Sequence, residues 1–261
     1  MAIKKTKKLS AQTATTTVAT GEKFAKVDAN GKVTLIDLAS LKTALLGGID
    51  TNAILDNVFI MYHQKADNFP LMAKPHRWPA LQNAGEIADG VVVVEGGKVL
   101  VVAPTEAGSA GLLWSSAEVN SGATMTGDRI TAMNDWNGKA NTASIISKST
   151  SSVVTNTNAY APGFCNLYSR ANANGEGLLA GKWWLPSVGE MMMICANTTK
   201  INYCLSLIAG ATLLRDGRYW TSTDTNSQGA WYVDLRNGSL YRWGTKVSDK
   251  AGVRPVSAFD Y

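Results

Sequence analysis

The stretch from Ala230 to Gly244, AWYVDLRNGSLYRWG, constrains the fold of this chain more than any other part of its sequence. Two aromatic-rich runs flank an Asn-Gly pair, which is the strongest short-range signal of a two-residue hairpin turn. A turn at Asn237-Gly238 sets the register of the two strands. The pairs that it places opposite each other are Arg236 and Ser239, Leu235 and Leu240, Asp234 and Tyr241, Val233 and Arg242, and Tyr232 and Trp243.

Opposed residues share a face of such a hairpin. One face is apolar apart from Arg242, and we expect it to meet the core; it carries Trp231, Val233, Leu235 and Leu240. The other face groups aromatic rings with charged and hydroxyl side chains, namely Tyr232, Asp234, Arg236, Ser239, Tyr241 and Trp243. This mixture is typical of a ligand-binding surface, because Tyr and Trp offer large contact areas at low side-chain entropy cost. The alternative is that another element covers this face and buries its rings.

Further elements are indicated upstream of the hairpin. The run GVVVVEGGKVLVVAP joins two β-branched segments through Gly96-Gly97, which predicts a second tight hairpin. Helical spacing indicates a helix within NDWNGKANTASIISKS. Ser187 and Glu190 form a capping box before a stripe made of Val188, Met191, Met192 and Cys195. A further helix carries Ile201, Cys204, Leu205 and Ile208 and ends at Gly210.

The N-terminal part of the chain differs from the rest in composition and in expected local structure. Residues 1–20 are a basic and Thr-rich tail that we expect to be flexible. Residues 21–50 read as a hairpin that turns at Asn30-Gly31, followed by a short helix with Leu38, Leu41, Leu45 and Leu46 on one side. Such a unit is too small to bury its apolar stripe alone, which predicts an oligomerisation or attachment segment. Residues 51–84, with three prolines, read as an irregular connector, and the main domain is expected at 85–261.

Composition limits the classes of protein that this chain can represent. With 261 residues, 45% of them hydrophobic, it can bury a sizeable core. Its net charge is +5, and four lysines lie within the first eight residues, so a solvated tail is favoured over a nucleic-acid or membrane patch. We expect no signal peptide, because no apolar stretch of suitable length follows these lysines, and no spanning helix. These features predict a protein made in the cytoplasm, without nucleic-acid binding or membrane insertion.

The residues that most often carry metal or catalytic chemistry are few. Cys165, Cys195 and Cys204 lack metal-ligand spacing, and buried free thiols are expected. The two histidines, His63 and His76, lie outside the predicted main domain without a surrounding cluster of cysteines or carboxylates. A histidine-based acid or base is therefore not indicated, and no phosphate-binding loop precedes a helix. The sequence predicts neither a metal site, nor a cofactor, nor an enzyme.

The order of signals in the second half of the chain resembles a known family. WWLPSVGEM, a helix, RYWTSTDT, AWYVDL, an Asn-Gly turn and VRPVSAF follow one another between Trp183 and Phe259. This order resembles the C-type-lectin-like fold of the variable proteins of diversity-generating retroelements, many of which are phage receptor-binding proteins. The resemblance covers residues 85–259 and implies an α+β domain with mixed, mostly antiparallel sheets and two main helices, preceded here by the small N-terminal hairpin and helix.

In such proteins, adenine-directed mutagenesis varies residues displayed on a stable scaffold, and the resemblance places the variable region at about 211–258. Asn-type codons can yield Tyr, Asp, Ser, Arg, Gly or Thr, a set that Trp243 fits less easily. The implied ligand-binding residues are Arg218, Tyr219, Thr225, Asn226, Ser227, Gln228, Tyr232, Asp234, Arg236, Ser239, Tyr241, Arg242, Trp243 and Thr245. Gly244 is a further flanking position at which the family tends to vary. The implied scaffold positions are Trp220, Ser222, Trp231, Val233, Gly238, Val253, Arg254 and Val256.

Two branches of this fold are not supported by the residues. Calcium-dependent lectins carry Glu-Pro-Asn or Gln-Pro-Asp loops, and neither tripeptide occurs here; Asn134-Asp135-Trp136 lies before the first predicted helix and does not match their ligand strand. Formylglycine-generating enzymes carry a terminal Arg-Gly-Gly-Ser, where this chain has Val253-Arg254-Pro255-Val256, and no cysteine pair resembles their active site.

The resulting hypothesis is a phage tail receptor-binding protein that displays a diversified surface to a host-surface protein or polysaccharide. It would be located in the virion, with the N-terminal segment contacting other tail proteins. Homo-oligomerisation is expected, as a trimer by analogy with phage fibres alone. Two alternatives stay open: a bacterial surface adhesin of the same fold, and a structural virion subunit whose aromatic face is buried against a neighbour.

Overall fold

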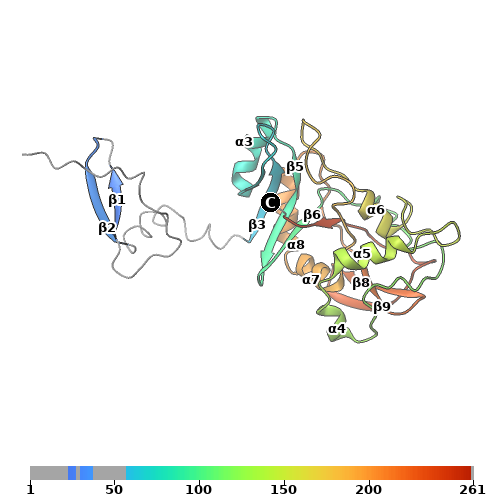
Figure 1. The fold of residues 1–261 in the computed structure, drawn as a ribbon. Coiled ribbons are helices and arrows are strands. Elements are labelled where there is room, and N and C mark those ends of the chain that lie inside the picture. Colours follow the sequence, from blue (N-terminus) through green and yellow to red (C-terminus); the bar gives the residue numbers. More distant parts are fainter. Residues whose placement is uncertain (1–22, 28–29, 38–56, 260–261) are drawn as a thin grey trace, which may run out of the picture. The chain divides into compact units, whose positions relative to one another are not determined.

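The computed structural model describes residues 23–27, 30–37 and 57–259, and the chain divides into two compact units, Met1–Asp56 and Asn57–Tyr261 (Figure 1). In the first unit, β1 (Lys23–Val27) pairs antiparallel with β2 (Val33–Asp37), which confirms the hairpin predicted there. Gly31 has a φ of 76°, a conformation that favours glycine at such a turn. The predicted tail and the predicted leucine-rich helix lie outside the described residues.

The larger sheet of the second unit has five strands in the order β10-β6-β5-β3-β4, all paired antiparallel. Glu95 pairs with Lys98 across Gly96 and Gly97, whose φ values are 56° and 74°, so the predicted two-residue hairpin is confirmed. The strands are β3 (Val58–His63), β4 (Pro70–Ala73), β5 (Ala88–Glu95), β6 (Lys98–Val102) and β10 (Val256–Ser257).

The prediction that residues 51–84 are a connector, with the main domain beginning at 85, is wrong for the described part of that range. β3 lies inside the sheet, between β5 and β4. The 3₁₀-helix η2 (Pro75–Arg77) and helix α3 (Trp78–Asn83) follow, and the Trp78 side chain is fully buried. The error has a physical cause: β3 is a short apolar run with buried residues on both sides, and such a run has no period that distinguishes strand from helix.

Five more helices lie in the described part of the second unit: α4 (Arg129–Met133), α5 (Gly138–Ser147), α6 (Ala161–Leu167), α7 (Val188–Ala196) and α8 (Thr198–Leu207). α5, α7 and α8 were predicted, and the capping box of α7 is present. The stripe predicted for α7 is partly wrong, since Met193 and Ile194 are buried while Met192 and Cys195 are only half-buried. The stripe of α8 is confirmed.

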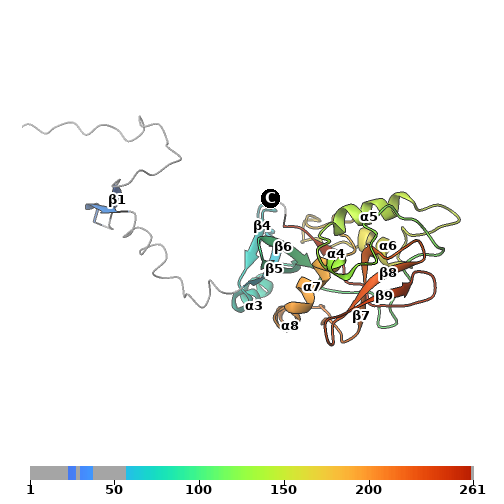
Figure 2. The same ribbon diagram turned by 90° about the horizontal axis from the view of Figure 1, so that it is seen from below.

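The second sheet is antiparallel and has the order β7-β8-β9, with β7 spanning Arg218–Asp224, β8 Gly229–Asp234 and β9 Ser239–Thr245. Helices α7 and α8 lie between the two sheets (Figure 2). One face of each sheet and these two helices enclose the main core, in which Val91, Met191 and Val233 are completely buried. The domain is therefore mixed α+β with antiparallel sheets, as predicted.

The opposite face of each sheet is also covered. Met61, Val92 and Trp183 belong to a small cluster on the far side of the larger sheet. Trp220 and Tyr232 belong to a cluster on the far side of the smaller one, packed against residues of α5 and α6. A sheet buried on both faces is rigid and leaves its turns, its edges and any bulges for display. No helix in the described ranges is long and apolar enough to cross a membrane.

Candidate functional site

The hairpin of β8 and β9 has a register different from the predicted one. A two-residue type I′ turn needs positive φ at both positions, and only Gly238 of the Asn-Gly pair has it, at 69°. The N–H of Gly238 instead donates to the carbonyl of Asp234 over 2.8 Å, which closes a four-residue loop. The observed pairs are Asp234 with Ser239, Val233 with Leu240, and Tyr232 with Tyr241.

This shift of two residues leaves the side chains of these pairs on the faces predicted for them, because the side-chain period of a strand is two. Val233 and Leu240 face the main core as predicted, together with Trp231. The opposite face is not a free surface. Tyr232 is 6% exposed, and its ring centroid lies 5.3 Å from that of Trp220. α5, α6 and the segments around them cover this face, so the alternative of a buried aromatic face is correct for Tyr232.

The fourteen residues predicted to bind a ligand fall into three groups. Seven are exposed: Arg218, Asn226, Ser227, Gln228, Arg236, Arg242 and Trp243. Four are half-buried: Thr225, Ser239, Tyr241 and Thr245. Three are buried and cannot be displayed, which corrects the prediction for Tyr219, Tyr232 and Asp234.

Tyr219 is part of a buried polar network. Its phenol donates to Glu106 Oε2 over 2.5 Å, and the same carboxylate is paired with Arg254 Nη2 at 3.2 Å. Burial, and next the negative charge of Glu106, raise the pKa of Tyr219. Arg254 also donates to the carbonyls of Ala103 and Thr212. Tyr219 and Arg254 therefore hold the C-terminal segment against β7, and Tyr219 has a structural role.

Asp234 is buried at the end of β8, where it orients an exposed arginine. Its carboxylate accepts from Arg236 Nε at 2.9 Å and from Arg236 Nη2 at 2.5 Å. The hydrogen bonds from Arg236 hold the pKa of Asp234 below its usual value. Because this fork is bidentate, the guanidinium of Arg236 has a defined orientation at the surface.

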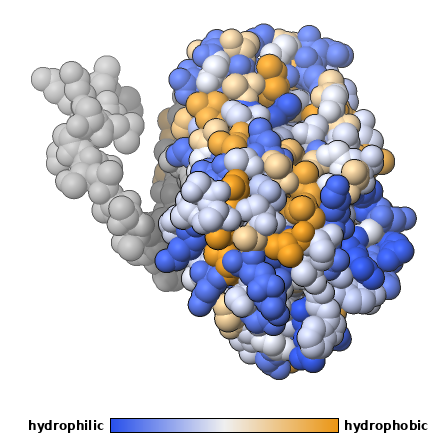
Figure 3. All heavy atoms as spheres, turned by 90° about the vertical axis from the view of Figure 1, so that its right-hand side faces the viewer, coloured by the Kyte–Doolittle hydropathy of each residue, from blue (hydrophilic) through white to orange (hydrophobic). Residues whose placement is uncertain are grey.

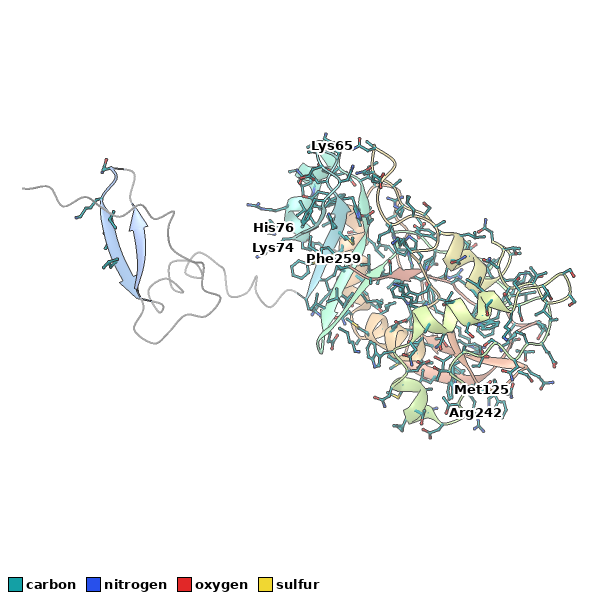
Figure 4. The ribbon with its side chains drawn as sticks, viewed as in Figure 1. Lys65, Lys74, His76, Met125, Arg242 and Phe259 are labelled. Atoms are coloured by element: carbon teal, nitrogen blue, oxygen red, sulfur yellow. The ribbon has the colours of Figure 1, made fainter. Side chains whose placement is uncertain are left out.

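A bulge in β9 turns two large side chains outward. Tyr232 pairs with Tyr241 and Ala230 with Gly244, so β9 contains an extra residue between these pairs. Arg242 and Trp243 are both exposed, with Trp243 at 72%, and the Arg242 guanidinium lies 4.4 Å from the Trp243 ring centroid. Figure 4 shows Arg242 projecting from the end of the domain at which β9 lies.

The expectation that Gly244 varies is wrong, because glycine is required at the inner end of this bulge. A Cβ placed on Gly244 would lie 2.5 Å from the Trp220 ring and 2.6 Å from the Tyr232 ring. Contacts this short could be relieved only if one of the two rings moved, and both rings are tightly packed in the buried cluster on the far side of the smaller sheet. The bulge is therefore a fixed feature that aims Arg242 and Trp243 at solvent.

A hollow of about 420 Å³ lies beside the bulge, and we call it the aromatic hollow. Its volume falls within the usual range of small-molecule sites. Figure 3 views the side of the molecule that lies on the right in Figure 1, where polar and apolar groups are interspersed. The hollow is lined by Gly127, Arg129, Trp231, Ser239, Leu240, Tyr241, Arg242 and Trp243.

Arg218 extends this surface from β9 across to β7. Its guanidinium carbon lies 4.7 Å from the ring centroid of Tyr241 and 5.1 Å from that of Tyr232. Arg218 Nη1 also donates to the Tyr232 hydroxyl over 3.1 Å. An arginine held over two rings loses less side-chain entropy when a ligand binds.

The loop between β7 and β8 adds a second displayed segment, 225–228. Asn226 Oδ1 accepts from the N–H groups of Gln228 and Gly229, each at 2.9 Å, which closes the loop on itself. Gln228 Nε2 donates to the carboxylate of Glu118. Below the loop, the buried Lys246 is paired with Asp224 at 2.9 Å. The loop is thus attached to a charged centre inside the domain.

The His, Asp and Glu side chains outside this surface have mainly protein partners in the described part of the chain. In the described part of the chain, no three His, Cys, Asp or Glu side chains are placed to hold a metal ion. His63 does have one carboxylate partner that the sequence did not reveal, since its Nδ1 lies 2.7 Å from Asp89 Oδ2. Asp135 is buried and accepts from Thr223 Oγ1 and Asn141 Nδ2, at 2.7 and 2.9 Å, which is a structural role.

Several residues of the surface were not predicted. Arg129 lines the aromatic hollow from α4, a helix too short to give a periodic signal. Arg215 and Lys250 flank the predicted variable strands and lie near Arg218 and Arg236 in a separate hollow. Their positive charge was the only available signal, and charge alone does not separate a binding residue from a solvated one.

Comparisons of the chain with protein families, with curated proteins and with solved structures find no match. Function must therefore be inferred from the surface itself. What the geometry provides is a rigid sheet that carries an exposed tryptophan, three exposed arginines and a short polar loop. Such a surface suits recognition, since aromatic and arginine side chains dominate binding energy at interfaces.

Proposed function

We propose that this chain is a ligand-binding protein that presents a diversified surface on a C-type-lectin-like scaffold, and that it serves as a phage tail receptor-binding protein. The single observation that carries the proposal is the pair Arg242 and Trp243, held outward by the β9 bulge beside a hollow. Replacing a large exposed ring leaves the stability of the fold unchanged. Such a ring, aimed at solvent by the backbone, also offers a large contact area to a ligand.

The arrangement of the sheets supports the scaffold part of the proposal. A C-type-lectin-like fold, as the sequence resemblance implies it, brings the N- and C-terminal strands into one sheet beside two helices. Here β10 joins the sheet that contains β3, and α7 and α8 follow one another between the two sheets. Two antiparallel sheets with this connectivity are what the proposal requires, although many binding and catalytic functions share one fold.

The distribution of burial supports the division into scaffold and displayed residues. The scaffold positions Trp220, Trp231, Val253, Arg254 and Val256 are all buried. Eleven of the fourteen implied ligand-binding residues are exposed or half-buried, and they lie at the start of β7, along β9 and in the β7–β8 and β8–β9 loops. Substitution at the seven exposed positions leaves the core packing unchanged, which is the condition a diversified surface must satisfy.

The N-terminal unit would attach the domain to the virion and to further copies of the chain, and repeated copies would raise weak single-site affinity by about 10² to 10⁴. Val33 and Leu35, on one side of β2, are 60% and 62% exposed. Exposed apolar side chains on a two-stranded hairpin fit a face that packs against another chain. The ligand would be a protein or polysaccharide of the host surface.

Diversification predicts a specific pattern of substitutions among isolates of one population. We expect changes to concentrate at Arg218, Arg236, Ser239, Tyr241 and loop 225–228, with Trp231, Val233 and Leu240 constant. The reason is that the first group is exposed or half-buried, whereas truncation of the fully packed second group would create a cavity. Sequencing the gene in many isolates, together with a search for a near-copy of its 3′ region beside a reverse transcriptase, measures this.

A uniform distribution of substitutions would contradict diversification. The surface would then be a fixed binding site or a contact between virion subunits, and the structural-subunit alternative would be preferred. A gene that lies apart from phage tail genes would instead favour the adhesin alternative. The distribution of substitutions therefore separates a diversified surface from a fixed one, and the position of the gene separates a tail protein from an adhesin.

Binding itself should depend on the bulge. In the double variant Arg242→Ala with Trp243→Ala, binding of the fluorescently labelled protein to bacteria from the same environment should fall by at least about tenfold, since exposed anchors of this kind dominate interfaces. Its unfolding free energy should stay within about 0.5 kcal/mol of the unaltered protein, because neither side chain is in the core. Flow cytometry and urea unfolding measure the two quantities.

A matched control is available on another face of the domain. Tyr203 on α8 is 56% exposed and is also a large aromatic residue. Tyr203→Ala should leave cell binding unchanged. If it weakens binding as much as the double variant does, the effect comes from general loss of surface aromatic groups and the β9 surface is not the site.

A further inference from the structure

The second hollow of the domain, which we call the basic hollow, has a volume of about 330 Å³ and lies between the β8–β9 loop and the start of β7. It is at the lower end of the range for small-molecule sites. Its walls are unusually cationic: four of its side chains carry positive charge and one carries negative charge. It is lined by Ser109, Ala110, Gly111, Arg215, Asp216, Gly217, Arg218, Arg236, Lys250, Ala251 and Gly252.

Three of these cations are held in place by partners behind them. Arg236 is fixed by the buried Asp234 through two hydrogen bonds. Arg215 Nε lies 3.2 Å from Oε1 of Glu106, whose side chain is 8% exposed. Arg218 is fixed over the rings of Tyr232 and Tyr241. Guanidinium groups that are oriented before binding retain free N–H donors at a reduced entropy cost.

Two glycines that line the basic hollow, Gly111 and Gly252, are packed too tightly to carry a side chain. A Cβ on Gly111 would lie 2.5 Å from the carbonyl oxygen of Ala251, and Gly111 has a φ of 67°. A Cβ on Gly252 would lie 2.9 Å from the Tyr219 ring and 3.1 Å from Arg215 Nη2. Glycine at both positions lets the main chain pack closely against Ala251, Tyr219 and Arg215 at the wall of the hollow.

The charge that remains in the basic hollow is small and positive. Within the described residues, Arg218 and Lys250 have no carboxylate within 4.0 Å, whereas Arg215 and Arg236 each have one. Glu106 is shared with the buried Arg254, so Asp216, Asp234 and Glu106 face five cations, and two positive charges are left. A bound anion would reduce this excess, and a planar carboxylate matches the fork of a guanidinium.

Resting on the proposed ligand-binding function, we propose that the basic hollow binds the carboxylate of an acidic sugar in the host-surface ligand. Tyr241 connects the two hollows, since it lines the aromatic hollow and its ring lies 4.7 Å from the Arg218 guanidinium. A saccharide whose acidic unit lies against Arg218 can therefore extend its next unit onto the rings of Tyr241 and Trp243. Trp243 is exposed and Tyr241 is half-buried, and aromatic rings offer a flat apolar surface to the apolar face of a sugar.

Titration with defined saccharides tests this inference on the full chain. The probes are trigalacturonate and N-acetylneuraminate, each with its methyl ester, and an acidic peptide of Asp and Glu. Either acid should shift the Nε–H resonance of Arg218 saturably, with a Kd of about 1 mM or lower, while the uncharged esters should not. The inference is overturned if neither acid binds, if the esters bind equally well, or if the acidic peptide binds more tightly than both acids.

Substitutions in the basic hollow locate the binding. Arg218→Gln and Lys250→Gln should each weaken binding of the acid by about tenfold, because each removes a cation that no carboxylate of the protein neutralises. Lys148→Gln, at an exposed lysine after α5, is the matched control and should change nothing. Equal losses in all three variants would mean that only the net charge matters, and this result would overturn the site.

The two proposals fail in distinguishable ways. If the unaltered protein binds bacteria but neither acid, the acidic-sugar inference is wrong and the receptor-binding proposal stands. If it binds the acids through Arg218 but binds no bacteria from its environment, the site is real and the receptor-binding role is wrong.

Discussion

Replacing Lys246 by Met should lower the free energy of unfolding by about 3–5 kcal/mol, because it leaves a buried carboxylate without its counterion. The side chains of Lys246 and Asp224 are both fully buried and are 2.9 Å apart. Lys246 Nζ also donates to the carbonyl of Val119 at 3.0 Å and lies 4.3 Å from the ring centroid of Trp114. A methionine fills a similar volume but offers none of these interactions.

The pKa shifts of Asp224 and Lys246 have the same main cause, which is the free-energy cost of burying a charge. Burial raises the pKa of Asp224, and Lys246 opposes this shift. Burial lowers the pKa of Lys246, and Asp224 opposes that shift. Desolvation is thus the largest influence on each group, and the pairing is the main interaction that opposes it. Removal of one partner alone should therefore be worse than removal of both.

A double variant provides the control. Asp224→Asn combined with Lys246→Met removes both charges while an amide oxygen can still accept from Ser121, which donates to Asp224 over 2.7 Å. The double variant should be more stable than Lys246→Met alone. Urea unfolding with an unchanged m-value measures both losses. A single variant within about 1 kcal/mol of the unaltered protein would mean that water or rearrangement solvates Asp224.

This ion pair also bears on the displayed surface. The backbone N–H of Lys246 donates to the carbonyl of Gln228 at 2.9 Å, and its Nζ lies 3.4 Å from the carbonyl of Asn226. Loop 225–228 is therefore anchored at its base by the same residue that neutralises Asp224. If the loop is diversified as proposed, such an anchor would hold its base whatever side chains the loop carries.

The elements that the sequence predicted well are those whose signals are local. The Gly96-Gly97 hairpin and the capping box of α7 each depend on a few adjacent residues, and both are present. The register of the β8–β9 hairpin was wrong although its signal was stronger, because Asp234 accepts from Arg236 and from the N–H of Gly238, which stabilises the wider loop. Local side-chain hydrogen bonds can override turn preference.

The candidate site was predictable only in part, and the reason is tertiary packing. The alternation of β8 and β9 gave the correct faces but not what covers them. Tyr232 is buried because Ile145 and Cys165, from helices nearly 70 residues upstream or more, pack into the same cluster. The outward turn of Trp243 depends on a bulge, and a bulge has no marker in the sequence other than the nearby Gly244.

Glu190 predicts an unusual pH dependence of stability. It is 6% exposed, and burial, opposed by hydrogen bonds from the Ser187 and Trp184 N–H groups, raises its pKa to about 7 from an ordinary value of 4.5. Between these two pH values the unfolded chain has lost the proton while the folded chain still holds it. The folded state then binds more protons, so this group makes the unfolding free energy fall as pH rises.

The expected size of this fall is about 3 kcal/mol between pH 4.5 and 7, with no further change from this group above pH 7. Glu190→Gln removes the titration, and its amide oxygen can still accept from Ser187 and Trp184, so any cost of burying the amide is the same at every pH. The difference in unfolding free energy between the variant and the unaltered protein should therefore move in favour of the variant as pH rises through this interval. Urea unfolding of both proteins at several pH values measures it. Parallel curves would mean that Glu190 is ionised in the folded state at pH 5, with water or Lys139 near Trp184 stabilising its charge.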